Sequence, residues 1–141
     1  MMNQEVRKIM TTDPVTVSPD QSVREVTQIM LEKKMQQLPV VSNGKLQGLI
    51  TSYDLWQEGS SQLNHASVKD VMTTNVLTIT PKDKVGTAAQ LFADKRFKTL
   101  PVVNLRNELK GVVTAFDVIR QAYVEEYPQP ILYKEEFLKK A

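Results

Sequence analysis

Residues 48–54 read GLITSYD, and residues 111–117 read GVVTAFD. In each copy an apolar run leads to a threonine (Thr51, Thr114) and, three residues later, to an aspartate (Asp54, Asp117). A threonine followed at this spacing by a carboxylate is typical of a capping box at the start of a helix. One copy alone is a weak signal. Two copies in matching contexts predict a pair of equivalent sites.

The repetition extends over most of the chain, as three further matches show: residues 6–12 (VRKIMTT) with 68–74 (VKDVMTT), 16–19 (TVSP) with 78–81 (TITP), and 38–41 (LPVV) with 100–103 (LPVV). The offset is 62 residues and becomes 63 after one extra residue in the second copy. A constant offset over about 50 residues indicates an internal duplication.

Each copy predicts the same order of elements, β-α-β-β-α. A short strand rich in β-branched residues, at 15–17 or 77–79, precedes a proline turn. A helix follows, with Ser22 to Glu25 as a capping box in the first copy. Its apolar face is expected at i, i+3, i+4 and i+7, which are Val23, Val26, Thr27 and Met30 in the first copy and Val85, Ala88, Ala89 and Phe92 in the second.

A β-hairpin and a second helix complete each copy. Asn43 and Gly44 predict a tight turn between strands at 38–41 and 46–50, because both residue types accommodate a positive φ. The second hairpin, 100–103 with 109–113, has a looser loop. The closing helices are expected over 53–58 and 116–127, each starting at its Thr-x-x-Asp sequence.

The expected organisation is a first repeat at 1–57, a linker at 58–67, a second repeat at 68–127 and a tail at 128–141, with one last helical turn over 134–140. A unit of about 55 residues is marginal for burying a core. The two repeats are therefore expected to pack against each other.

Composition limits the classes of function. The 141 residues carry a formal charge of +2, with basic and acidic residues interspersed. This distribution does not predict a basic surface that binds nucleic acid. The chain has no cysteine, which excludes disulfides, thiolate metal ligands and a cysteine nucleophile. No signal peptide and no apolar run of about 18 residues is present. We expect a soluble, intracellular, cytoplasmic protein without membrane insertion.

The chain resembles a tandem pair of cystathionine-β-synthase (CBS) domains, often called a Bateman module. The resemblance covers residues 6–120 and rests on the Met-Thr segment, the Thr-x-Ser/Thr-Pro turn, Leu-Pro-Val-Val and Gly-x-x-Thr-x-x-Asp, each present twice and in order. It implies an α/β (α+β) fold of two β-α-β-β-α CBS repeats with pseudo-twofold symmetry, commonly homodimeric. It also implies binding of an adenosine-containing ligand such as AMP, ADP, ATP or S-adenosylmethionine between the repeats. Many such modules regulate a partner protein.

The resemblance also implies roles for single residues. Asp54 and Asp117 would bind ribose hydroxyls, because an ionised carboxylate is an acceptor for both. The phosphate side would be formed by the residues near the capping threonines and before Leu-Pro-Val: Thr51, Thr114, Lys98, Thr99, Gln36 and Gln37. The adenine side would be bordered by Thr12, Asp13, Thr74, Asn75, Tyr53 and Phe116, with Met35 and Phe97 as further ring neighbours.

Four of these site residues also have a plain structural explanation. Thr51 to Asp54 and Thr114 to Asp117 can be helix caps without any ligand. A dimerisation or scaffold module with empty clefts is therefore the main alternative to a ligand-binding regulatory module. The single histidine, His65, lies in the linker without the convergent partners that catalysis or metal binding needs. No nucleophile elbow, phosphate-binding glycine loop or metal cluster is present in the sequence, so we expect no enzyme.

Overall fold

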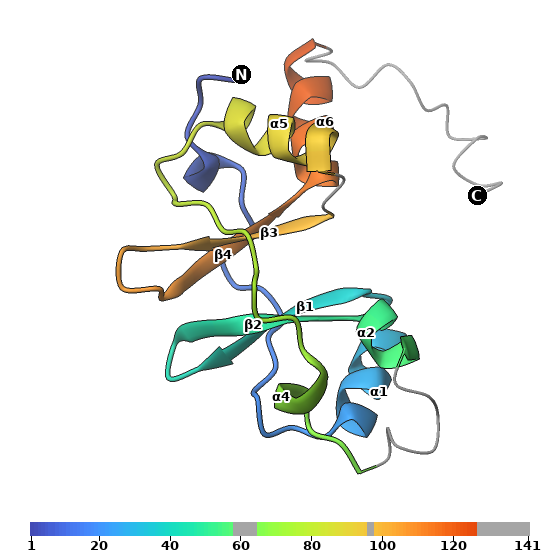
Figure 1. The fold of residues 1–141 in the computed structure, drawn as a ribbon. Helices are drawn as coiled ribbons and strands as arrows, with labels where there is room; N and C mark the ends of the chain where they lie inside the picture. Colours follow the sequence, from blue (N-terminus) through green and yellow to red (C-terminus); the bar gives the residue numbers. More distant parts are fainter. Residues whose placement is uncertain (58–64, 96–97, 127–141) are drawn as a thin grey trace, which may run out of the picture.

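The computed structural model of the protein describes residues 1–57, 65–95 and 98–126. Two antiparallel hairpins lie next to each other in the middle of the molecule, and helices lie beyond each of them (Figure 1). The elements are, in order, a 3-10 helix (Val6–Lys8), α1 (Val23–Lys33), β1 (Gln37–Ser42), β2 (Lys45–Thr51), α2 (Ser52–Gln57), α4 (Val68–Val71), α5 (Val85–Lys95), β3 (Thr99–Val103), β4 (Leu109–Thr114) and α6 (Ala115–Glu126). The predicted fold class is confirmed.

The hairpin turns follow their sequences. Ser42 pairs with Lys45 across the β1–β2 turn, and Asn43 and Gly44 have φ values of 52° and 80°, as the Asn-Gly pair predicts. In the β3–β4 loop the Asn104 side-chain oxygen accepts hydrogen bonds from the N–H groups of Arg106 and Glu108. The longer second loop is therefore closed by an asparagine side chain.

The helices are close to their predicted positions. The buried side chains of α1 and α5 are Val23, Val26, Met30, Val85, Ala88 and Phe92, which belong to the predicted apolar faces. Ser22 caps α1 by accepting from the N–H of Glu25 at 3.0 Å. α2 and α6 begin one residue earlier than predicted, and their predicted last residues, Glu58 and Tyr127, lie outside the described residues.

The strands predicted at 15–17 and 77–79 are shorter than expected. One residue in each, Val17 or Ile79, forms a parallel bridge to the neighbouring hairpin. The reason lies in the turn that follows. The N–H of Ser18 donates to the Gln21 side chain, and the N–H of Thr80 donates to the Asp83 carboxylate, so the next residue of the segment leaves the sheet.

The first segment of each repeat packs in the other half of the molecule. Val6 is fully buried in the core that contains Val85 and Val113, whereas Val68 is fully buried in the core that contains Val23 and Ile50. In Figure 1 the N-terminal segment accordingly lies beside α5 and α6, and α4 lies beside α1. The two hydrophobic cores thus exchange their opening segments, and each repeat needs the other to complete its core.

Two glycines allow these segments to cross close to a strand. A Cβ on Gly48 would lie 2.5 Å from the carbonyl oxygen of Thr73, and a Cβ on Gly111 would lie 2.5 Å from that of Thr11. The crossing segments are bonded there, by Leu49 with Thr73 and by Thr11 with Val112. The glycine of Gly-x-x-Thr-x-x-Asp is therefore required by backbone packing.

The pseudo-twofold relation appears in pairs of equivalent hydrogen bonds. The N–H of Val6 donates to the carbonyl of Asp83 at 2.7 Å, and the N–H of Val68 donates to that of Gln21 at 2.9 Å. The hairpin tips are also joined, because Leu109 donates to the carbonyl of Gly44 at 2.9 Å. The expected packing of the two repeats is observed.

Candidate functional site

Asp54 lies where the start of α2 meets the crossing segment from the other repeat. Its Oδ2 accepts the N–H of Thr51 at 3.0 Å, and its own N–H donates to the Thr51 hydroxyl at 3.0 Å. The predicted capping box is therefore formed. The hydroxyl of Thr73 also approaches the carboxylate, at 3.3 Å from Oδ1 and 3.4 Å from Oδ2. Since a carboxylate has about four acceptor positions, Asp54 retains acceptor capacity for a ligand.

Asp117 has the same arrangement at the start of α6. Its Oδ2 accepts the N–H of Thr114 at 2.8 Å, and its N–H donates to the Thr114 hydroxyl at 3.1 Å. The half-buried carboxylate lies in a pocket of about 310 Å³ together with Thr11. The other residues that line this pocket are Lys8, Ile9, Met10, Arg120 and Gln121. A volume near the lower end of the usual range of ~300–1,000 Å³ is suited to part of a small ligand.

The residues predicted for the phosphate side lie at the start of the hairpins. The ammonium of Lys98 donates to the side-chain oxygen of Gln36 at 3.2 Å, and both side chains are exposed. The two positions are equivalent in the duplication, so their contact lies between the two repeats. Gln37 pairs with Thr51, and Thr99 pairs with Thr114. Each predicted phosphate-side residue is therefore next to a capping threonine or between the two halves.

Gln37 also stands out by the hydrogen bonding of its side chain. Its side-chain oxygen is buried and has no hydrogen-bond partner among the described residues. A buried acceptor without a donor costs free energy of about 1–3 kcal/mol. Gln4, which is not a predicted site residue, has the same feature, so this feature does not by itself mark a ligand position.

The residues predicted for the adenine side do not form one group. Thr74 lines a small cleft of about 150 Å³ with Gly48 and Asn107, and its neighbour Asn75 is exposed. Thr12 and Asp13 are exposed in the loop after Thr11. The two ring candidates, Tyr53 and Phe116, expose 58% and 66% of their surface on the helices. Of the remaining ring candidates, Met35 lines a groove between α1 and α2, and Phe97 is outside the described residues.

Four residues near the aspartates were not singled out by the sequence: Thr11, Thr73, Lys8 and Arg120. Thr73 and Thr11 lie one position before the predicted Thr74 and Thr12, and their proximity depends on the crossing of the opening segments. Arg120 follows Asp117 by three residues, a spacing that places both on one side of a helix. That spacing is a signal by which Arg120 could have been found.

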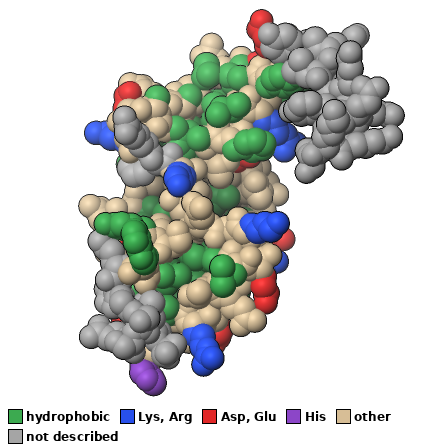
Figure 2. Space-filling model, turned by 90° about the vertical axis from the view of Figure 1, so that its right-hand side faces the viewer, with side chains coloured by type: hydrophobic (Ala, Val, Ile, Leu, Met, Phe, Trp, Pro, Cys, Tyr) green, Lys and Arg blue, Asp and Glu red, His purple; other side chains and the backbone are tan. Residues whose placement is uncertain are grey.

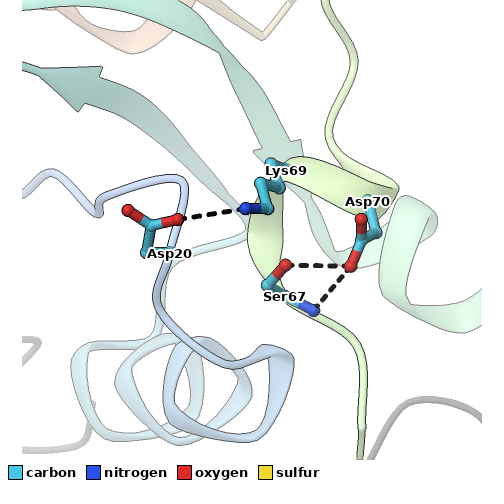
Figure 3. A network of polar contacts seen from close by, with 4 residues as sticks. All are labelled: Asp20, Ser67, Lys69 and Asp70. Carbon is cyan, nitrogen blue, oxygen red and sulfur yellow. Dashed lines mark hydrogen bonds and ion pairs between the residues drawn. The ribbon is translucent and has the colours of Figure 1, made fainter.

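The start of α4 carries a carboxylate that is fixed in place. The carboxylate of Asp70 accepts the N–H of Ser67 at 3.1 Å and its hydroxyl at 2.8 Å, while Lys69 reaches Asp20 at 3.3 Å (Figure 3). The backbone hydrogen bond from Ser67, followed by that from its hydroxyl, lowers the pKa of the Asp70 carboxyl below its ordinary value. Asp70 therefore remains ionised near neutral pH.

Exposed apolar side chains occur on the helices of both halves. Trp56 and Leu31 expose 80% and 74% of their surface beside the groove between α1 and α2, which holds about 560 Å³. Phe116 and Ile119 are similarly exposed on α6. Figure 2 shows hydrophobic side chains at the surface of both the upper and the lower half. Isolated exposed apolar residues are common on protein surfaces, and only contiguous groups of them mark contact surfaces.

Within residues 1–57, 65–95 and 98–126, no three His, Cys, Asp or Glu side chains are grouped so as to hold a metal ion. His65 is exposed. In those ranges the helices are all too short or too polar to cross a bilayer.

The chain matches the CBS domain family at residues 6–55 and again at 68–123. The inosine-5'-monophosphate dehydrogenase of Korarchaeum cryptofilum is 38% identical over 117 residues, which are 82% of this chain and 23% of that enzyme. The chain thus spans about a quarter of the length of this relative.

Two solved structures extend the comparison. CBSX2 in complex with AMP has a TM-score of 0.78 and 30% identity, covering 86% of this chain and 98% of that one. The CBS domain pair of MJ0100, in complex with 5-methylthioadenosine and S-adenosyl-L-methionine, has a TM-score of 0.75 and 27% identity, with 86% and 98% covered.

Proposed function

The chain belongs to the CBS domain family, and on this basis we propose that it is a regulatory module that binds an adenosine-containing ligand in the clefts between its two repeats. One observation carries the proposal. Each Thr–Asp pair lies beside the opening segment of the other repeat, as the Thr73 contact with Asp54 and the pocket shared by Thr11 and Asp117 illustrate. A ligand at either aspartate would touch both halves of the molecule.

The ligand class is supported by the solved relatives. CBSX2 was crystallised with AMP, and the MJ0100 pair with 5-methylthioadenosine and S-adenosyl-L-methionine, all of which contain adenosine. The candidate ligands for this chain are therefore AMP, ADP, ATP and S-adenosylmethionine. No catalytic cofactor is part of the proposal.

The chemistry of the proposed binding follows from the residues. Asp54 and Asp117 would accept hydrogen bonds from ribose hydroxyls, and charge assistance makes such bonds strong. Thr51, Thr114 and the hairpin-start residues Gln36, Gln37, Lys98 and Thr99 would border the phosphate. Thr12, Asp13, Thr74, Asn75, Tyr53 and Phe116 would border the adenine.

Regulation would operate by a population shift. A ligand that contacts both repeats favours one of their relative orientations, and a partner protein that distinguishes the orientations responds. The partner is an unidentified cytoplasmic protein in this proposal. The exposed apolar side chains around Trp56 and Phe116 support a homodimer formed through the helices, which sedimentation equilibrium would detect as twice the monomer mass.

A dimerisation or scaffold module without ligand remains the second candidate. It is favoured by the capping boxes, because Thr51–Asp54 and Thr114–Asp117 satisfy each other in the structure without a ligand. Turnover of a nucleotide is not proposed, and release of product from any of the four ligands would contradict the regulatory assignment.

Thermal unfolding separates the two candidates. The melting temperature is measured with AMP, ADP, ATP or S-adenosylmethionine at high concentration, with inosine as a ligand that lacks the adenine amine. A ligand present at about 100 times its Kd adds roughly 2.7 kcal/mol, which raises the melting temperature by a few degrees. An unchanged melting temperature with all four ligands would exclude adenosine binding and leave the scaffold.

A further inference from the structure

The pocket around Asp117 contains two basic side chains. Lys8 comes from the N-terminal 3-10 helix, and Arg120 comes from α6, one turn after Asp117. Both residues are exposed, and neither makes an ion pair with any residue in the described part of the chain. The pocket therefore joins one carboxylate to two cations that have no acidic partner.

The duplicated half has different charges at the same positions. The offset of 62 residues places Asp70 where the first copy has Lys8, and the offset of 63 places Gln57 where the second copy has Arg120. Asp70 is an ionised carboxylate, held by Ser67, and Gln57 is uncharged. The two cations of the Asp117 pocket thus have no basic counterpart at the equivalent positions of the duplication.

A third pair of equivalent positions shows the same difference. Lys98 immediately precedes Thr99, which pairs with Thr114 in the Asp117 half. Its equivalent in the Asp54 half is Gln36, and the two side chains are in contact. All three positions therefore differ in charge between the copies, but only Lys8 and Arg120 line the Asp117 pocket, whereas Lys98 lies at the contact between the two repeats.

We propose that the Asp117 pocket is selective for a phosphorylated adenosine ligand, that Lys8 and Arg120 bind its phosphate there in place of the hairpin-start residues, and that the Asp54 site has no such preference. The inference rests on the proposed function and adds the ligand class and the residues that select it. Arg and Lys are the usual phosphate partners, Arg as a planar fork and Lys as a point charge. In this chain they occur together at one of the two aspartates.

The signs of the charges support this difference between the two sites. A phosphate placed next to an aspartate is repelled by its carboxylate, and this repulsion falls inversely with distance. At Asp117 the two nearby cations offset the repulsion, whereas the equivalent positions of the duplication, Asp70 and Gln57, supply no cation. Because these groups are exposed, salt will screen the effect, with a Debye length of about 8 Å at physiological ionic strength.

The test compares AMP with adenosine, which differ in the phosphate alone. Calorimetric titration of the full chain should give a lower Kd for AMP than for adenosine, and the ratio should fall as salt is raised. Arg120→Gln copies the residue of the other half, and Lys8→Gln removes the second cation. Each substitution should weaken AMP binding by about tenfold, the loss expected for one charged hydrogen bond, while the Kd for adenosine stays within about twofold.

Two variants serve as matched controls. Arg106→Gln removes one positive charge at the β3–β4 loop, outside the Asp117 pocket, and should leave both Kd values unchanged. Gln57→Arg gives the first copy the residue that the second copy has at Arg120, and it should strengthen AMP binding without changing adenosine binding.

The possible results separate the two proposals. If adenosine binds and Arg120→Gln weakens AMP alone, the inference is supported. If adenosine and AMP bind equally, or if Arg106→Gln weakens AMP as much as Arg120→Gln does, the phosphate assignment is wrong although the proposed function stands. If neither compound nor any other adenosine ligand binds, both the function and the inference are overturned.

Discussion

The Asp54 half and the Asp117 half hold their Thr–Asp pairs in the same way and surround them with different charges. The two capping boxes have bond lengths of 3.0 and 3.0 Å in the first half, and 2.8 and 3.1 Å in the second. At the positions equivalent to Lys8 and Arg120, the sequence has Asp70 and Gln57. The duplication has thus kept the geometry of the two caps, while charged residues at other equivalent positions differ. Structural substitutions should accordingly affect both halves alike, and ligand substitutions should not.

The largest structural effect is expected at the glycines beneath the crossing segments. Gly48→Ala and Gly111→Ala would each bring a Cβ to 2.5 Å from a carbonyl oxygen, so a strand or the crossing segment must move. We expect each to lower the free energy of unfolding in urea by about 3 kcal/mol, near the top of the range for overpacking. Gln47→Ala, on the exposed face of β2, is the control and should change little. A large loss at one glycine alone would show that the halves are not equivalent.

The capping threonines should have a smaller and again equal effect. Thr51→Ala and Thr114→Ala each remove the hydroxyl that accepts the N–H of the aspartate. Loss of an N-cap costs about 1 kcal/mol. Thermal unfolding should show a lowered melting temperature for both alanine variants. Thr51→Ser and Thr114→Ser retain the hydroxyl and should have the melting temperature of the wild type. If serine does not restore it, the methyl packing of threonine matters more than the cap.

The smallest effect is expected at Asp70, a charged residue that differs between the two copies and also has a structural role. The pKa of Asp70 is lowered in the folded state, so its contribution to stability is present above the unfolded pKa and is lost as the pH falls through the folded value. Between about pH 5 and 2, Asp70→Asn should therefore reduce the dependence of unfolding on pH, and Lys8→Gln should not. Identical acid profiles for wild type and Asp70→Asn would contradict the assigned role of Ser67.

Local patterns predicted most of the secondary structure and missed the exchange of segments. Asn43-Gly44, the apolar faces of α1 and α5, and both capping boxes depend on neighbouring residues, and each was found where predicted. The burial of Val6 with Val85 and of Val68 with Val23 depends on contacts between residues far apart in sequence. The periodicity of apolar residues within one segment does not predict such contacts.

The limits on predicting the site have the same origin. The caps formed by Asp54 and Asp117 were predicted correctly because the spacing of each aspartate to its threonine is local. Thr73 and Lys8 were missed because they reach the aspartates only after the crossing, which no spacing rule describes. The strands at Val17 and Ile79 were predicted too long. Strand propensity does not account for the side chains that accept the N–H of the next residue and so take the chain out of the sheet.

The central claim is that two equally built sites differ in the ligand they accept, and AMP titration of the aspartate variants tests it most directly. Asp117→Asn and Asp54→Asn each keep an amide oxygen that can accept the threonine N–H, so the caps should persist while the charge is removed. We predict that Asp117→Asn raises the Kd for AMP about tenfold and that Asp54→Asn leaves it within about twofold. Equal effects of the two substitutions, or a larger effect of Asp54→Asn, would contradict this account.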